Sequence, residues 1–202
     1  MADIDPKQVM KLRGETDASM MECKRALVEA NADFDKAKEI LRKRLGEIAD
    51  KKAGKETTVG AIGSYVHATE GVGRVGALVE LGSNTDFVAK NPEFQSLLRD
   101  LAVAVAAFDP KYVSKDQVPA PVLEEEKAKY AADVKGKPPQ IAEKILEGKL
   151  EKNLYSRLCL LHMPYPKEDE FKGTYGEFIK SKIAKLGENL VVRRFYRMEL
   201  GR

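Results

Sequence analysis

The sequence predicts an α+β protein in which a small antiparallel sheet and a separate block of helices share one core. Two β-rich runs, at 59–81 and 189–200, lie on either side of a long helical block, whereas an α/β protein alternates strands and helices. The first fifty residues instead contain three short stripes of helical period. We therefore expect a three-helix module at 1–50, a linker at 51–58 and an α+β core domain at 59–202.

Composition is typical of a globular protein that works in the cytoplasm. The 35 basic and 32 acidic residues leave a net charge of +3, whereas nucleic-acid-binding domains usually carry a clustered basic excess. No apolar run is long enough to cross a bilayer, and the first residues lack the apolar segment of a signal peptide. We expect no direct contact with nucleic acid or membrane. Cys23 and Cys159 lie far apart and form no CxxC pair, which indicates neither a disulfide framework nor a metal site.

Three helices are expected in the module. The first begins at Asp5 and Pro6, an acidic cap followed by a proline that fits the first turn, and ends at Gly14. The second begins at Thr16 or Asp17. Its apolar stripe consists of Met20, Cys23, Leu27 and Ala30. The third carries Phe34, Ala37, Ile40, Leu41 and Leu45 on one side.

Met21 lies off the stripe of the second helix, on a neighbouring face with Val28. A small bundle leaves some apolar side chains exposed, and Met21 fits that description. Methionine also adapts its shape to irregular grooves, which favours a surface that binds a partner. The pattern leaves both interpretations open.

A β-hairpin is expected between residues 59 and 81, with its turn at 70–73. The glycines at 71, 73 and 76 spell GxGxxG across that turn. A dinucleotide-binding fingerprint needs a helix after the glycines, so that phosphate meets the helix N-terminus. Another strand follows here, so we expect no dinucleotide site, and a titration with dinucleotide tests the oxidoreductase alternative.

The rest of the chain is predicted to be mainly helical. Helices are expected over 92–108, 122–135, 139–154 and 174–186. The apolar segment 159–166 contains two prolines and is expected to be extended. In the final strand we expect Arg193, Arg194 and Arg197 to reach solvent.

One loop stands out, GSNTDFVAKN at 82–91, between the hairpin and the helix that begins at Asn91 and Pro92. Polar residues are expected in a strand-to-helix turn, but an aromatic residue at its tip is not. Either Phe87 folds back onto the core, or it is presented to another molecule. The pattern does not decide between them.

Catalytic chemistry has little support in the sequence. His67 and His162 are the only histidines, and the sequence has neither a glycine-flanked nucleophilic serine nor a GK[ST] phosphate loop. We expect His162 to be an ordinary structural histidine. His67 is on the strand that pairs with the one leading to Phe87, so it is a candidate for the same surface. We expect no catalytic residue, cofactor or metal site.

Two motifs, LRGETDASMMECKRALVEANADFDKAKEILR at 12–42 and TDFVAKN at 85–91, resemble the bacterial elongation factor Ts family, the guanine-nucleotide exchange factors of elongation factor Tu. The segments PPQIAEKILEGKLEKNL and VVRRFYRMEL resemble later parts of the same family, so the resemblance covers nearly the whole chain. It implies an exchange factor that promotes GDP release so that GTP can bind.

The resemblance also implies site residues. The residues of the TDFV loop, Thr85, Asp86, Phe87 and Val88, would contact the partner GTPase near its nucleotide and disturb magnesium and phosphate coordination. The N-terminal helices, similar to ubiquitin-associated domains, would dock on another face of that GTPase. Their contacts would be Arg13, Met20 and Met21.

The chain departs from the long members of the family, which have a duplicated core. Here SYVH, ending at His67, precedes a single TDFV loop, as in the short form of the family, in which two chains act together. We therefore predict a homodimer through the sheet-bearing core, with His67 as a further partner contact from one of the two chains. The alternative is a non-catalytic module that binds a ubiquitin-like protein or peptide, on a dimeric platform. That alternative predicts full affinity from 1–50 alone.

Overall fold

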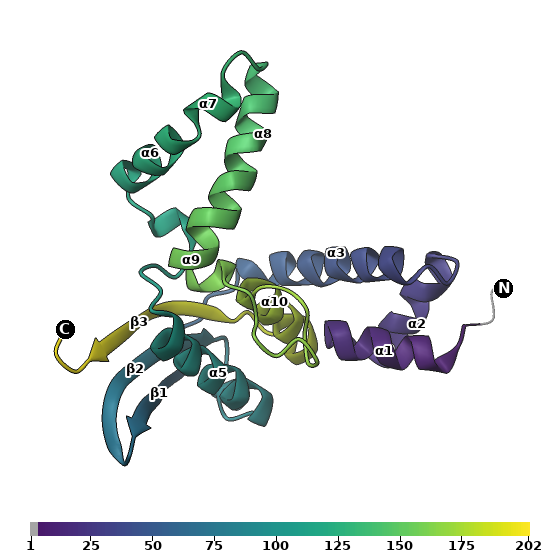
Figure 1. Cartoon of the computed structure of the whole chain (residues 1–202). Helices are drawn as coiled ribbons and strands as arrows, with labels where there is room; N and C mark the ends of the chain where they lie inside the picture. The colour runs from purple at the N-terminus through teal and green to yellow at the C-terminus, as the bar shows by residue number, and fades with distance from the viewer. Residues whose placement is uncertain (1–3) are drawn as a thin grey trace.

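A computed structural model describes residues 4–202 and confirms the α+β class. A three-stranded antiparallel sheet in the order β1-β2-β3 is combined with helices, and a bundle of three N-terminal helices extends to one side (Figure 1). Residues 1–3 of the module expected at 1–50 lie outside the described residues. No helix within 4–202 is long and apolar enough to cross a membrane.

The bundle consists of α1 (Pro6–Thr16), α2 (Met20–Glu29) and α3 (Phe34–Ala53) around its own apolar cluster, in which Leu12, Leu27 and Leu41 are fully buried. The prediction that the first helix ends at Gly14 is wrong. The helix continues to Thr16, whose hydroxyl donates to the Leu12 carbonyl at 2.6 Å, and ends at Asp17, where φ is 52°.

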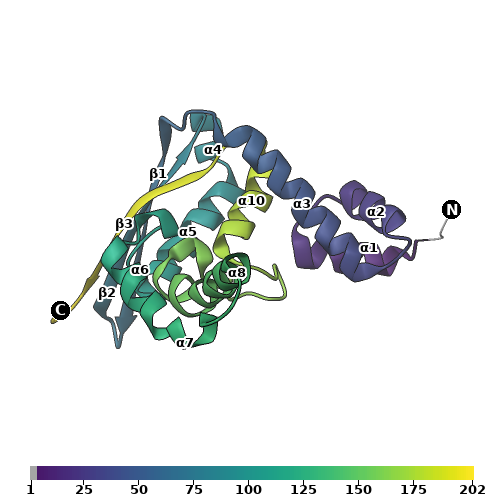
Figure 2. The same ribbon diagram turned by 90° about the horizontal axis from the view of Figure 1, so that it is seen from above.

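The other two helices of the bundle also differ from their predicted bounds. The second begins at Met20 because Ser19, one position before it, is the N-cap and accepts a hydrogen bond from Glu22. The third continues through residues 51–53, the first part of the expected linker. As a result α3 reaches from the bundle to the core domain (Figure 2). There Ala49 joins the main apolar cluster.

The predicted hairpin is confirmed as β1 (Val59–Thr69) and β2 (Val72–Ser83), and β3 (Val191–Glu199) pairs with β2. Glu70 and Gly71 form the turn with φ of 53° and 80°. Two successive positive φ angles define the turn type that matches strand twist, and glycine adopts such an angle without strain. The glycine run therefore lies in a hairpin, without the strand-to-helix context of a dinucleotide site.

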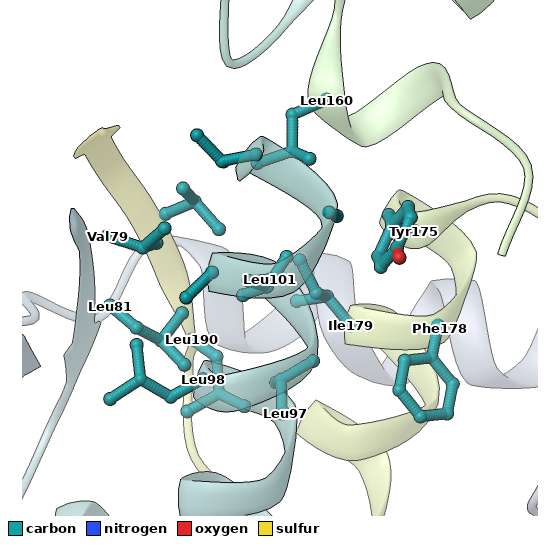
Figure 3. Close-up of a cluster of buried hydrophobic side chains, with 14 of the residues drawn as sticks. Val79, Leu81, Leu97, Leu98, Leu101, Leu160, Tyr175, Phe178, Ile179 and Leu190 are labelled. Carbon is teal, nitrogen blue, oxygen red and sulfur yellow. The ribbon is translucent and has the colours of Figure 1, made fainter. Parts of the chain in front are cut away.

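The main core lies between the inner face of the sheet, α5 (Pro92–Phe108) and α10 (Tyr175–Leu186). Val79 and Leu81 of β2 contact the apolar stripe of α5, and Tyr175 and Phe178 of α10 cover the opposite side of that helix (Figure 3). Alternation along β2 predicts this arrangement, since residues two apart share one face of a strand. Arg197 is on this inner face as well, donating from Nε to the Ala106 carbonyl at 3.1 Å, so the prediction that it reaches solvent is wrong.

A helical arm projects from the core (Figure 1). It contains α6 (Ala120–Lys129), α7 (Ala131–Val134), α8 (Pro139–Leu150) and α9 (Ser156–Leu158), so the single helix expected over 122–135 is interrupted at Tyr130. A π-helical turn, Glu151–Tyr155, joins α8 to α9. The segment expected to be extended at 159–166 includes a 3-10 turn, Leu160–His162, and there the prediction is wrong.

Candidate partner-binding site

The TDFV segment forms a helical turn rather than an open loop. The strand β2 ends at Ser83, and the helix α4 (Asp86–Ala89) begins two residues later with Thr85 as its N-cap. The Thr85 hydroxyl accepts a hydrogen bond from the Val88 amide at 3.4 Å. Phe87 is 88% exposed, the highest value among the large apolar side chains of the described residues. Of the two interpretations left open by the sequence, the presented Phe87 is therefore the one observed.

The other residues of the segment divide between surface and core. Asp86 and Thr85 are exposed next to Phe87, whereas Val88 is half-buried and packs on the main apolar cluster. Burying Val88 and Ala89 on one side of this helical turn fixes the turn to the core and leaves its opposite side in water. The segment therefore presents an aromatic ring and a carboxylate together.

The segment that links α10 to β3 in the same chain holds the start of this turn. Glu188, between α10 and β3, accepts from the amides of Asn84 and Thr85 at 3.2 and 3.0 Å and from the Thr85 hydroxyl at 2.6 Å. Next to it, the amide of Asn189 donates to the Asn84 side-chain oxygen at 2.8 Å. Sequence reasoning missed both residues, because they are about a hundred positions from the loop. The one local signal is Gly187, which ends α10 with φ of 74° and starts a new chain direction.

The three candidate contacts on the N-terminal bundle are all exposed. Met20 is 42% and Met21 60% exposed, and Arg13 is also exposed, on α1. The prediction that Met20 belongs to the buried stripe is wrong: it is the first residue of α2, outside the interface that buries Cys23 and Leu27. Arg13 and Met20 line a shallow hollow between the bundle and α10.

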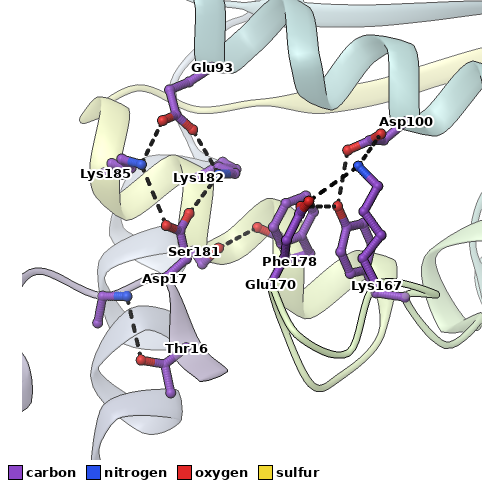
Figure 4. A network of polar contacts seen from close by, with 12 residues as sticks. Thr16, Asp17, Glu93, Asp100, Lys167, Glu170, Phe178, Ser181, Lys182 and Lys185 are labelled. Atoms are coloured by element: carbon purple, nitrogen blue, oxygen red, sulfur yellow. Dashed lines mark hydrogen bonds and ion pairs between the residues drawn. The ribbon is translucent and has the colours of Figure 1, made fainter. Parts of the chain in front are cut away.

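A network of ion pairs connects the bundle to the core beside this hollow (Figure 4). Lys182 of α10 contacts Asp17 at 2.6 Å and Glu93 at 2.7 Å, and Lys185 contacts Glu93 at 2.7 Å. Asp17 follows α1 in the bundle, whereas Glu93 is in the first turn of α5, six residues after Phe87. The network therefore joins the two regions that carry candidate partner contacts.

Glu93 and Lys182 are each held in their ionised form. Hydrogen bonds from Lys182 and Lys185 lower the pKa of Glu93 to about 2, although desolvation opposes the shift. Burial by itself lowers the pKa of Lys182, but its hydrogen bonds to Asp17 and Glu93 outweigh that effect, and the net pKa is raised. The Lys182 side chain is only 10% exposed, and these contacts more than compensate its lost hydration.

This shift predicts a pH dependence of stability. Because the pKa of Glu93 is lower in the folded state than its ordinary value of 4.5, its contribution is fully present above that value and is lost as the pH falls towards about 2. The melting temperature of the Glu93→Gln variant is expected to be lower than that of the wild type at pH 7, and the two melting temperatures are expected to converge near pH 2. Since Glu93 is 38% exposed, salt reduces the difference at pH 7. A difference that is equal at both pH values would contradict this role.

His67 lies far from Phe87 within one chain. Ser83, just before the TDFV segment, pairs with Val59 at the start of β1, whereas His67 is eight residues further along that strand. At about 3.3 Å per residue the two positions are about 26 Å apart along the sheet. His67 is exposed, and its Nδ1 lies 3.2 Å from the Tyr65 hydroxyl. The hypothesis that His67 and Phe87 share a surface is therefore wrong for a single chain.

The outer face of the sheet is apolar and exposed. One side of each strand contributes to it, and the exposed fraction of its large apolar side chains is between 48% and 76%. They are Ile62 and Val66 of β1, Leu78 of β2, and Tyr196 and Met198 of β3. Together with Leu200, most of them line a shallow depression. Monomeric proteins rarely expose a contiguous apolar patch of this kind, so this outer sheet face is a candidate interface.

Neither cysteines nor histidines form a metal site in the part of the chain that the structure describes. No group of three or more potential metal-binding side chains is found within 4–202. Cys23 and Cys159 are both buried, and burial raises the pKa of each thiol, that of Cys159 to about 11. His162 contacts Glu151 at 2.6 Å and lies beside Tyr155. These are packing and hydrogen-bonding environments.

Comparison with known proteins gives one consistent result. A family model described as elongation factor TS matches residues 7–172. The protein named elongation factor Ts of Thermodesulfovibrio yellowstonii is 45% identical over 98% of this chain and 96% of its own length. Those of Fervidobacterium nodosum and Pseudothermotoga lettingae are 46% and 47% identical, again over 98% of this chain, and over 99% and 98% of their own lengths. These relatives have nearly the same length as this chain.

Proposed function

This chain belongs to the elongation factor Ts family, and from that premise we propose how its surfaces act on the partner. It is a guanine-nucleotide exchange factor for elongation factor Tu in translation elongation, and it promotes GDP release so that GTP can bind. As an exchange factor it changes the binding of a nucleotide to another protein. We propose that it has no catalytic residue of its own and acts in the cytoplasm, without direct contact with nucleic acid or membrane.

We propose that the TDFV turn is inserted into the GTPase domain of elongation factor Tu near the bound nucleotide. The observation that carries this proposal is the 88% exposed Phe87 on an anchored helical turn. Burying the ring in the partner is favourable, whereas leaving it in water is not, so the free energy of that contact can hold the GTPase in an opened form. Asp86 and the Thr85 hydroxyl then lie beside the magnesium and phosphate site and disturb its coordination.

Nucleotide release provides the direct test. Elongation factor Tu loaded with a fluorescent GDP derivative is mixed with excess unlabelled GDP, with and without this protein. We expect the release rate to rise with the concentration of the factor until it saturates. The affinity between the two proteins is expected to fall in the presence of GDP by the same factor as the affinity for GDP falls in the presence of this protein. A release rate that is independent of this protein would refute the proposal.

A second contact is proposed on the N-terminal bundle, through Arg13, Met20 and Met21. Their exposure supports it, because two methionines side by side at the start of α2 give an adaptable apolar surface. The arginine adds a charged donor at its edge. This contact holds the partner while the TDFV turn acts at the nucleotide.

Met21→Ala is expected to weaken the complex with nucleotide-free elongation factor Tu by about tenfold, because burial of a methionine contributes about 1.5 to 3 kcal/mol and part of that remains with alanine. Titration calorimetry or biolayer interferometry measures the dissociation constant. The matched control is Ile141→Ala on α8, an apolar side chain that is 50% exposed on the helical arm. If both substitutions have the same small effect, the bundle is not the docking surface.

We propose that the protein is a homodimer through its outer sheet face. The apolar character of that face supports an interface between copies, because a two-fold axis pairs each patch with itself. The separation of His67 and Phe87 supports it too. When the two-fold axis lies between the two sheets and perpendicular to the strands, the His67 end of one sheet lies over the Phe87 end of the other. The two stacked sheets are then about 10 Å apart. One partner-binding site would then contain Phe87 of one chain and His67 of the second.

A further inference from the structure

We propose that Glu188 is a positioning residue for the exchange reaction: it fixes the backbone from which Phe87 projects. This inference rests on the proposed role of Phe87. Neither Glu188 nor its neighbour Asn189 is among the proposed contacts with elongation factor Tu. Both residues contact the start of the TDFV turn from within the protein, away from the exposed Phe87 ring.

The bonds made by Glu188 converge on the start of the turn. One carboxylate oxygen accepts from the amides of Asn84 and Thr85, and the other accepts from the Thr85 hydroxyl. That hydroxyl is at the same time the N-cap of α4. The carboxylate therefore orients the one side chain that determines where the helical turn begins. Phe87 is two residues further on.

The exposure of Phe87 makes this support necessary. An 88% exposed ring has few packing contacts to hold it, so the backbone from residue 84 to residue 88 sets its direction. Val88 packs on the core at one end of that backbone, and Glu188 holds the other end. Preorganisation of this kind matters because a displacement of about 1 Å at a reacting group can cost about a hundredfold in rate.

Asn189 extends the same support to the N-terminal bundle. Its amide donates to Asn84, and its side-chain nitrogen donates to the carbonyls of Ala53 and Lys55, at 3.2 and 3.0 Å. Ala53 is the last residue of α3. The junction between α10 and β3 thus holds the TDFV turn and the end of the bundle's longest helix in one fixed arrangement.

The test measures saturated GDP release from elongation factor Tu together with the affinity of the complex. Glu188→Ala removes all three acceptor contacts, and we expect a release rate about tenfold lower, with the dissociation constant for GDP-bound elongation factor Tu changed by less than about twofold. Glu188→Gln keeps an oxygen that can accept both backbone amides, so we expect a loss of less than about threefold. Glu143→Ala, at an exposed glutamate of α8, is the matched control and is expected to behave as the wild type.

A double-mutant cycle with Phe87→Ala separates positioning from general stability. If Glu188 acts through Phe87, adding Glu188→Ala to Phe87→Ala lowers the rate by less than about twofold more. An equal tenfold loss in both backgrounds would overturn the inference, as would a normal rate for Glu188→Ala. If Glu188→Ala lowers the melting temperature too far for the assay, the release rate of Glu188→Gln decides. A loss of less than about threefold supports the inference, because this variant keeps an acceptor for both amides, and a tenfold loss contradicts it. A normal rate for Phe87→Ala itself refutes the proposed function instead.

Discussion

Replacing Phe87 by alanine is expected to slow GDP release from elongation factor Tu by about 10- to 100-fold. Full burial of a phenylalanine contributes about 1.5 to 3 kcal/mol, and each tenfold change in rate corresponds to about 1.4 kcal/mol. Since Phe87 is almost fully exposed in the free protein, nearly all of that burial takes place in the complex. Stopped-flow fluorescence with labelled GDP measures the rate at saturating factor.

The same arithmetic limits what Phe87 can do alone. A thousandfold acceleration requires about 4 kcal/mol, more than one ring supplies. The remaining contacts must hold the opened partner, so Phe87→Ala is expected to retain a measurable part of the exchange activity. Only interactions that are stronger in the opened state than in the closed state contribute to the acceleration.

Phe108→Ala is the matched control for this experiment. It removes the same side chain from the far end of α5, where the ring is 47% exposed. We expect the wild-type release rate for this variant and an unchanged melting temperature for Phe87→Ala, because an exposed ring contributes little to folding. Equal rates for the two variants would remove Phe87 from the mechanism.

The second large effect is expected from pairing two defective chains. Phe87→Ala and His67→Ala are co-expressed with different tags, and the heterodimer is purified on both. If each site takes Phe87 from one chain and His67 from the other, one of the two sites in the heterodimer is intact and the second carries both substitutions. We expect about half of the wild-type exchange activity, compared with about a tenfold loss or more for either homodimeric variant.

A site built within one chain gives the opposite result, because both sites of the heterodimer then carry one substitution each. Its activity would resemble that of the two single variants. Tyr196→Glu in both chains is the control, since it places a charge on the outer sheet face, beside Leu78 of the central strand, and is expected to dissociate the dimer. Light scattering after gel filtration measures the mass, and a dimeric Tyr196→Glu protein would contradict the proposed interface.

Local patterns predicted the elements that depend on local physics. The N-caps at Asp5 and Asn91, and the hairpin expected between residues 59 and 81, appear in the structure as the sequence predicts. Errors occurred where a tertiary contact decided the outcome. The first helix continues past Gly14 to an end at Asp17, which pairs with Lys182 of α10, and the expected linker begins as helix because α3 packs against the core.

The site was predicted in part for the same reason. Phe87 attracts notice in the sequence because an aromatic residue at a turn is unusual, and the resemblance to a known family indicates its role. Glu188 and Lys182 give no such signal, because charged residues near the end of a helix are common on any surface. Only the fold shows that one reaches the TDFV turn and that the other joins Asp17 to Glu93. The position of His67 likewise depended on strand register, which sequence alone did not supply.

The helix α3 has a consequence for the choice of partner. Its 20 residues span about 30 Å as one continuous rod from the bundle into the core. The proposed docking residues and Phe87 are therefore presented at a set separation, which is fixed again by Asn189 at the end of that rod. A GTPase whose two receiving surfaces have another spacing can engage one contact but not both. If both proposed contacts are needed, selectivity for elongation factor Tu over related GTPases follows from this separation, and inserting one helical turn into α3 would change it.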